Sequence, residues 1–115
     1  MGEKQVDVPE IDIAETVKRR AEGAPVIDVR EPEEYVEGHV SGAALIPMAT
    51  VPERVAEIIT DGPVLIICRS GARSRSAAEF LRTQGIDAMN VSGGTMEWIR
   101  AGHPVVTGAE AGARA

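Results

Sequence analysis

Short apolar runs alternate along this chain with segments in which apolar residues recur at helical spacing. Runs of strand length occupy residues 26–29, 44–47, 64–68 and 88–91, and a shorter one lies near residues 9–11. Strands that alternate with helices form mostly parallel sheets covered by those helices, so the pattern predicts an α/β fold. The run VLII, which opens the third of these segments, has no polar alternation and is typical of a strand buried on both faces.

The helices between these strands are predicted from their capping residues and apolar faces. Asp12 with Glu15, and Thr50 with Glu53, have the spacing of a capping box at a helix start. A third helix is expected after residue 68, and Gly85 is placed to end it. The expected apolar faces are Ile13, Val17 and Ala21 in the first helix, Val55, Ile58 and Ile59 in the second, and Ala77, Ala78, Phe80 and Leu81 in the third.

Length and hydropathy limit the possible architecture. A chain of 115 residues is long enough for one hydrophobic core and too short for two. We expect one domain over residues 8–106, with flexible termini at 1–7 and 107–115. No apolar stretch approaches the roughly 20 residues that a membrane span needs, and the N-terminus lacks the features of a secretory signal. A cytoplasmic protein without a membrane partner is therefore expected.

Charge and cysteine content exclude several kinds of partner. The 12 basic and 18 acidic residues give a formal net charge of -6, which argues against nucleic acid or an anionic membrane as a partner. The single cysteine cannot form an internal disulfide, and with two histidines it supplies too few ligands for a structural zinc site. The thiol of this cysteine is therefore free for other chemistry.

That cysteine, Cys68, lies where the predicted central strand ends and the loop CRSGARSRS begins. Free cysteines are among the most buried residue types, so a place in the core is the simpler interpretation of an isolated one. However, Arg69, Arg73 and Arg75 follow within seven residues, and arginines are rarely buried without a partner. We therefore expect the loop to lie at the surface or at the mouth of a pocket.

A loop between the carboxyl end of a strand and the start of a helix can hold an anion. It presents unpaired backbone N–H groups and the positive end of the helix dipole. Gly71 permits a positive φ, with which the backbone can wrap around a central atom, although an ordinary turn glycine is the alternative. Such surroundings, together with the arginines, lower the pKa of a thiol because they stabilise the thiolate. The sequence therefore predicts Cys68 as a nucleophile.

Neither histidine is a convincing general base for Cys68. His103 lies beside Pro104, and His39 is interpreted as a turn residue that hydrogen-bonds to its own backbone, with a catalytic role as the weaker alternative. A thiolate that attacks a sulfane sulfur displaces a stable anion, and no proton moves in that step. Sulfur chemistry therefore suits this loop without a base.

The loop CRSGARS resembles the active-site loop of the rhodanese sulfurtransferases, in which a cysteine carries the transferred sulfur as a persulfide. Residues 26–47 are similar to the Asp-x-Arg and Gly-His-x-x-Gly-Ala motifs of that family, and residues 91–105 to its closing Gly-Gly-x-x-x-Trp motif. The resemblance covers about residues 8–106. The chain departs from the family at Ser41, where proline is common, and at Leu45, where asparagine is frequent. Both positions lie away from the expected site.

The resemblance implies a single-domain fold in which helices flank both faces of a central, mostly parallel five-stranded sheet. It implies that Cys68 takes sulfane sulfur from thiosulfate or a related small donor, and passes it to cyanide, a thiol or a protein acceptor. Neither a metal nor an organic cofactor is needed for this exchange. The residues expected to bind substrate are Arg69, Ser70, Gly71, Ala72, Arg73 and Arg30, and those expected to support the site are Asp28 and Ser74.

Several alternatives stay open on the sequence alone. Asp28 and Arg30 can pair with each other instead of contacting substrate, and Arg69, Arg73 and Arg75 can be solvated loop charges. A phosphatase or arsenate reductase also uses a thiolate and an arginine, but tyrosine phosphatases place that arginine at the equivalent of position 74, which is a serine. A non-enzymatic persulfide carrier or a regulatory binding module of the same fold is the remaining alternative.

Overall fold

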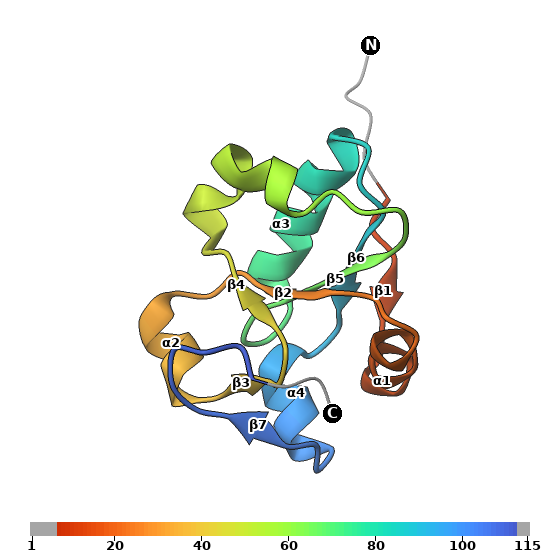
Figure 1. Cartoon of the computed structure of the whole chain (residues 1–115). Helices are drawn as coiled ribbons and strands as arrows, with labels where there is room; N and C mark the ends of the chain where they lie inside the picture. Colours follow the sequence, from red (N-terminus) through yellow and green to blue (C-terminus); the bar gives the residue numbers. More distant parts are fainter. Residues whose placement is uncertain (1–6, 113–115) are drawn as a thin grey trace.

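A five-stranded parallel sheet forms the centre of the protein. The computed structural model describes residues 7–112, and the strands of this sheet lie in the order β1-β6-β5-β2-β4 (Figure 1). Every pairing between them is parallel. Their bounds are Glu10–Ile11 (β1), Val26–Asp28 (β2), Ala44–Leu45 (β4), Val64–Ile67 (β5) and Ala88–Val91 (β6). The predicted α/β fold with a central parallel sheet is confirmed.

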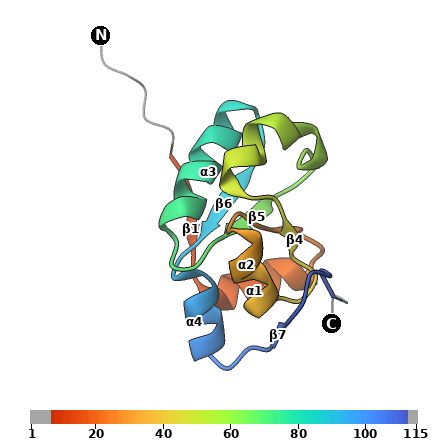
Figure 2. The ribbon, with the colours of Figure 1, turned by 90° about the vertical axis from the view of Figure 1, so that its left-hand side faces the viewer.

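Helices cover both faces of the sheet (Figures 1 and 2). Their bounds are Ile13–Ala21 (α1), Pro32–Glu37 (α2), Met48–Glu57 (the 3-10 segment η1), Ala72–Thr83 (α3) and Gly94–Arg100 (α4). Val64 and Ile66 of β5 belong to the core cluster with η1 and α3, whereas Leu65 and Ile67 belong to the cluster with α1 and α4. All four side chains are fully buried, so β5 is the central strand that its apolar run predicts.

The first predicted helix is confirmed at its start and differs on its buried face. Asp12 caps α1, because its carboxylate accepts a hydrogen bond from the Glu15 amide at 2.8 Å. Thr16 is buried and Ala21 is exposed, which reverses the expectation for Ala21. The Thr16 hydroxyl donates to the backbone carbonyl of Asp12 at 2.8 Å, and this bond allows a polar side chain on the buried face.

The second predicted helix is wrong in its cap and partly in its apolar face. It begins at Met48, and the Thr50 hydroxyl donates to the carbonyl oxygen of Pro47 at 2.8 Å instead of capping the helix. Ile59 is 63% exposed, whereas Val51 and Ile58 are buried. Ile59 is exposed because the segment ends at Glu57 and Ile58 caps it, so Ile59 lies beyond the helical face.

A second, two-stranded sheet joins segments that are far apart in the sequence. β3 (His39–Val40) pairs antiparallel with β7 (Val105–Val106). The apolar pattern predicts neither strand, because two residues are too few to show a strand period. This small sheet places β7 beside the segment that follows α2, as Figure 1 shows.

The chain beyond β7 stays in contact with the domain. The amide of Gly42 donates to the carbonyl of Ala111 at 2.7 Å, and His39 Nε2 lies 2.8 Å from the carbonyl oxygen of Glu110. These contacts attach the first part of the tail that the sequence predicts to be flexible. The rest of the predicted flexible termini, at 1–6 and 113–115, lies outside the described residues.

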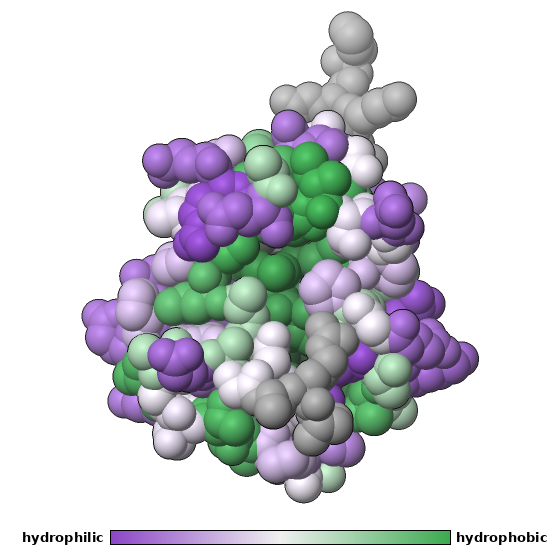
Figure 3. Space-filling model, in the orientation of Figure 1, coloured by the Kyte–Doolittle hydropathy of each residue, from purple (hydrophilic) through white to green (hydrophobic). Residues whose placement is uncertain are grey.

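The surface combines apolar and polar areas. In Figure 3, apolar residues cross the middle of the visible face, around the place where Figure 1 shows β2 and β4, and polar residues mixed with some apolar ones lie above and below them. β4 is an edge strand of only two residues, so it offers little backbone for pairing with another chain. Among residues 7–112, no helix has the length and apolar character required to span a membrane.

Candidate active site

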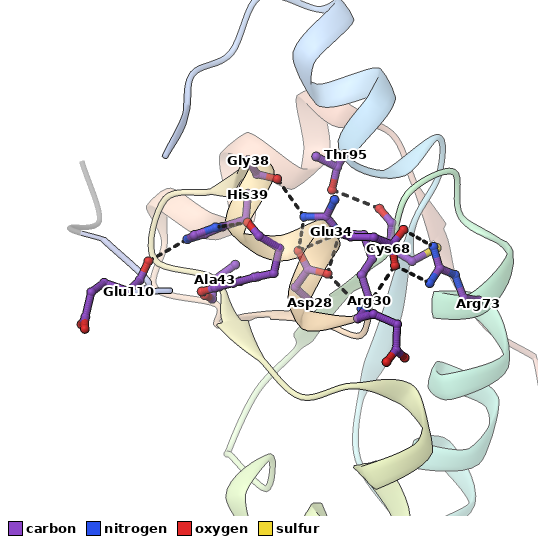
Figure 4. A network of polar contacts seen from close by, with 12 residues as sticks. Asp28, Arg30, Glu34, Gly38, His39, Ala43, Cys68, Arg73, Thr95 and Glu110 are labelled. Carbon is purple, nitrogen blue, oxygen red and sulfur yellow. Dashed lines mark hydrogen bonds and ion pairs between the residues drawn. The ribbon is translucent and has the colours of Figure 1, made fainter. Parts of the chain in front are cut away.

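The carboxyl edge of the parallel sheet brings the predicted site residues together (Figure 4). Cys68 directly follows β5, and Asp28 ends the neighbouring strand β2. The chain turns from Cys68 into α3 through Gly71, whose φ is +110°. The positive φ predicted for Gly71 is confirmed, and it lets the loop curl back over the sulfur. In open α/β sheets this edge is where ligands bind.

The sulfur of Cys68 is held by donors of its own loop. Its Sγ accepts hydrogen bonds from the amide of Gly71 at 3.1 Å and from the hydroxyl of Ser74 at 3.2 Å. Burial by itself raises the pKa of the Cys68 thiol, but hydrogen bonds from the Ser74 hydroxyl and from the backbone of Ser74, Gly71 and Ser70 lower it below its ordinary value. The loop therefore stabilises the thiolate, and its leading donors are amides and a hydroxyl rather than arginine side chains.

Helix α4 holds the backbone of the cysteine loop. This role of α4 was not predicted from the sequence. The carbonyl oxygen of Cys68 accepts hydrogen bonds from the Thr95 amide at 2.9 Å and from the Thr95 hydroxyl at 3.0 Å. The amide of Met96 donates to the carbonyl of Arg69 at 3.1 Å. Gly94, with φ of +62°, allows this close approach of two backbones. The paired glycines at the start of α4, Gly93 and Gly94, are the sequence signal that indicates this close contact.

A chain of hydrogen bonds extends from Cys68 to the edge strand β1. The Ser74 hydroxyl contacts Asn90 Oδ1 as well as the sulfur, and the Asn90 side-chain amide donates to the carbonyl of Gly71 at 3.0 Å and to Glu10 at 2.9 Å. A hydroxyl has one proton, so Ser74 donates either to the thiolate or to Asn90. The ionisation of Cys68 therefore decides whether the Ser74 hydroxyl donates its proton to the sulfur or to Asn90.

Carboxylates pair with two of the three arginines that follow Cys68. Arg73 donates to Glu34 of α2 through two hydrogen bonds of 2.8 Å, and Arg75 forms an ion pair with Glu10. Arg69 is exposed, and within residues 7–112 its side chain has no hydrogen-bond or ion-pair partner. The ion pair between Glu34 and Arg73 could not be predicted from the sequence.

The other loop residues predicted to bind substrate lie around the sulfur. Ser70 and Ala72 are exposed, and Gly71 between them is buried. Ala72 begins α3, so its amide belongs to the first turn of that helix. Substrate binding by these residues stays a prediction.

Asp28 and Arg30 form a buried ion pair at the end of β2. Arg30 Nε lies 2.9 Å from Asp28 Oδ1 and Arg30 Nη2 lies 2.8 Å from Asp28 Oδ2. Arg30 also donates to the carbonyl of Gly38 at 2.9 Å, and it lines a groove of about 330 Å³ with Arg69 and Thr95. These contacts favour the alternative in which the pair fixes the local geometry, and substrate binding by Arg30 stays a prediction.

Comparison with known proteins decides the family. The sequence matches the family described as "Rhodanese-like domain" over residues 13–101. The chain belongs to the rhodanese family. A sulfurtransferase of Allochromatium vinosum is 40% identical over 102 residues, which cover 86% of this chain and 95% of that protein. The thiosulfate sulfurtransferase GlpE of Pseudomonas putida is 38% identical over 90 residues, or 77% of this chain and 81% of that one.

The fold of a solved rhodanese agrees with this assignment. A rhodanese-related protein of Thermoplasma volcanium superposes with a TM-score of 0.79 at 33% sequence identity. The match covers 89% of this chain and 99% of that one. The resemblance inferred from the sequence motifs is therefore confirmed.

The two histidines of this rhodanese are engaged away from the cysteine. The ring of His39 stacks on Tyr35 with centroids 3.5 Å apart, and its Nδ1 lies 2.8 Å from the carbonyl oxygen of Tyr35. The expected bond to nearby backbone is confirmed, but His39 is a fully buried residue of β3, so its interpretation as a turn residue is wrong. The ring of His103 lies against Trp98, with centroids 4.7 Å apart.

The Ser74→Ala variant of this rhodanese is expected to have a higher thiol pKa than the wild type. The substitution removes the hydrogen bond from the Ser74 side chain, which is the largest of the effects that lower the pKa of Cys68. Burial of the sulfur, which raises this pKa, is kept. The pH midpoint of iodoacetamide alkylation, which follows the thiolate, should move to higher pH. Ser76→Ala, an exposed change on the same helix, should leave the midpoint in place. An unmoved midpoint in Ser74→Ala would show that the loop amides suffice.

Proposed function

We propose that this rhodanese is a sulfurtransferase in which Cys68 takes sulfane sulfur from thiosulfate or a related donor and transfers it to cyanide, a thiol or a protein acceptor. The setting of Cys68 Sγ supports this role most directly, because an amide and a hydroxyl donate to it and the thiol pKa lies below its ordinary value. The relatives named sulfurtransferase and thiosulfate sulfurtransferase support the same chemistry.

In the first half-reaction the Cys68 thiolate attacks the outer sulfur of thiosulfate. A bond forms between Sγ and that sulfur while the sulfur–sulfur bond of thiosulfate breaks, and sulfite leaves with the electron pair. Total charge is unchanged, and no proton moves. The Gly71 amide and the Ser74 hydroxyl, which hold the thiolate, are placed to hold the persulfide that replaces it.

In the second half-reaction the acceptor attacks the terminal sulfur of the persulfide. Cyanide leaves as thiocyanate, or a thiolate leaves as a new persulfide, and the Cys68 thiolate is regenerated. The donors that lower the pKa of Cys68 also make its thiolate a better leaving group. The same loop therefore assists both steps.

The size and charge of the loop support sulfur rather than phosphate as the transferred group. Only six residues run from Cys68 to Arg73, and the donors of the loop converge on one sulfur atom. Arg73 lies one residue before the position at which a tyrosine phosphatase places its arginine, and Glu34 binds it. A phosphatase activity therefore has less support than sulfur transfer.

Intact-mass measurement after incubation with thiosulfate tests the proposal. The reduced wild-type protein is expected to gain one sulfur atom, and to lose it with release of thiocyanate when cyanide is added. The Cys68→Ser variant is expected to gain none, with complete loss of turnover. A wild-type protein that alkylates normally at Cys68 but gains no sulfur from any donor would leave the carrier, binding-module and phosphatase alternatives, which a phosphatase-substrate assay then separates.

A further inference from the structure

Glu34 forms an ion pair with Arg73, one of the arginines that the sequence predicts to bind the donor. Each carboxylate oxygen of Glu34 accepts a hydrogen bond of 2.8 Å from Arg73, in the arrangement that Figure 4 shows. Hydrogen bonding to Arg73 is the largest of the effects that lower the pKa of Glu34 to about 2. Glu34 is therefore a carboxylate at neutral pH. A fixed negative charge thus accompanies the positive charge of Arg73.

Arg73 lies within electrostatic reach of the reacting sulfur. The hydrogen bonds to Glu34 are the first cause of its raised pKa, and the charges of Glu34, Cys68 and Glu31 also contribute. The side chains of Arg73 and Glu34 are 38% and 30% exposed, so an incoming small anion can meet the pair directly. A donor that approaches Cys68 therefore meets a neutral pair rather than a free cation.

Other arginines near the loop are paired as well. Arg30 is bound to buried Asp28, and Arg75 is bound to Glu10. In the part of the chain that the structure describes, Arg69 keeps an exposed side chain without a partner. With a net charge of -6 on the chain, the site attracts a doubly charged anion less than its arginine content alone indicates.

We propose that Glu34 is a specificity-determining residue that reduces the preference of the site for doubly charged sulfur donors. This role rests on the proposed sulfur transfer. By neutralising Arg73, Glu34 weakens the attraction of a dianion more than that of a monoanion of the same chemistry. The wild-type site is accordingly expected to favour thiosulfate over singly charged sulfane-sulfur donors less than it would without Glu34.

Two donors that differ by one charge make this role measurable. Thiosulfate gives its outer sulfur to the Cys68 thiolate and leaves as sulfite, a dianion. Methanethiosulfonate gives its outer sulfur to the same thiolate and leaves as methanesulfinate, a monoanion. In both reactions one sulfur–sulfur bond breaks, one forms, and the leaving group takes the electron pair. The ratio of kcat/KM for the two donors therefore reports the charge preference of the site.

Glu34→Gln removes the charge and keeps a side chain that can still hydrogen-bond to Arg73. It is expected to raise the kcat/KM ratio of thiosulfate to methanethiosulfonate by roughly three- to tenfold, because one unit of negative charge is lost near the donor. The gain should shrink as ionic strength increases. Glu33→Gln is the matched control, because Glu33 is an exposed residue of the same helix and loses the same charge. Its ratio should stay that of the wild type.

Equal changes for both donors in Glu34→Gln would overturn the proposal, because they indicate that Glu34 only positions the loop. An unchanged ratio, or an equal rise in Glu33→Gln, would overturn it too. These outcomes concern charge preference, and they are distinct from a failure of sulfur transfer itself.

Alkylation of Cys68 decides the role of Glu34 without sulfur transfer. Iodoacetate and iodoacetamide both form a thioether with the thiolate and release iodide, and only iodoacetate is an anion. Glu34→Gln should raise the rate ratio of iodoacetate to iodoacetamide, and Glu33→Gln should not. If wild-type protein takes sulfur from neither donor, the proposed function fails, while a raised alkylation ratio still supports the electrostatic role of Glu34. An unchanged alkylation ratio overturns that role.

Discussion

Replacing Gly94 by alanine is expected to lower the free energy of unfolding by roughly 2–5 kcal/mol. Gly94 has a φ of +62°, and a Cβ there would lie 2.6 Å from the carbonyl oxygens of Cys68 and Arg69. A left-handed backbone costs other residues roughly 1–2 kcal/mol, and overpacking adds roughly 1–3 kcal/mol. Urea unfolding measures the loss. Because the clash falls on the cysteine loop, sulfur transfer should fall even under conditions where the variant is folded.

Gly85→Ala is the matched control for Gly94→Ala. Gly85 also has a positive φ, of +84°, but a Cβ there meets nothing within 4 Å. The free energy of unfolding of this variant should fall only by the cost of the left-handed backbone, roughly 1–2 kcal/mol. The variant should keep full activity. Equal losses of stability in the two variants would show that close approach to the cysteine loop is not what requires glycine at position 94.

The Arg30→Met variant is expected to be less stable than the wild type by about 3–5 kcal/mol. Asp28 has no exposed surface and Arg30 is 5% exposed, so removing the guanidinium leaves a buried carboxylate without its charge partner. Burial of an unpaired charge is among the largest single losses that a substitution can cause. The free energy of unfolding in urea measures this effect.

Two further variants separate burial of the charge from loss of the arginine stem. Asp28→Asn combined with Arg30→Met removes both charges and keeps an acceptor for the Arg30 backbone amide, which donates to Asp28. The double variant should therefore recover part of the stability that Arg30→Met loses. Arg100→Met, on a side chain that is 82% exposed, should change stability by no more than about 0.5 kcal/mol. Arg30→Met with an equally small effect would contradict the importance of the buried pair.

The main sheet could be predicted from the sequence because most of its strands lie in short, largely apolar runs. VLII is the clearest example, since its lack of polar alternation places β5 at the centre of the sheet. The small sheet of β3 and β7 could not be predicted, because its strands pair across most of the chain and each has two residues. Ile59 was wrongly placed on the apolar face of η1 because the sequence does not show that this segment ends at Glu57.

The candidate site could be predicted as far as local sequence determines it. Cys68 and Gly71 lie in one short loop, so the end of an apolar strand and a central glycine suffice to indicate a nucleophile in a curled backbone. The partner of Arg73 could not be predicted, because Glu34 lies on another element and many surface carboxylates could have been brought to it. Asn90 was missed for the same reason, since only the pairing of β5 with β6 brings it beside Ser74.

The hydrogen bonds from Cys68 through Ser74 and Asn90 to Glu10 connect the nucleophile with an edge strand of two residues. Edge strands with few hydrogen bonds open locally at a lower free energy than central ones. If β1 opens, Glu10 withdraws from Asn90, and the side-chain amide of Asn90 becomes less restricted. We therefore expect the reactivity of the sulfur to depend on the stability of β1, whose free energy of opening native-state hydrogen exchange measures.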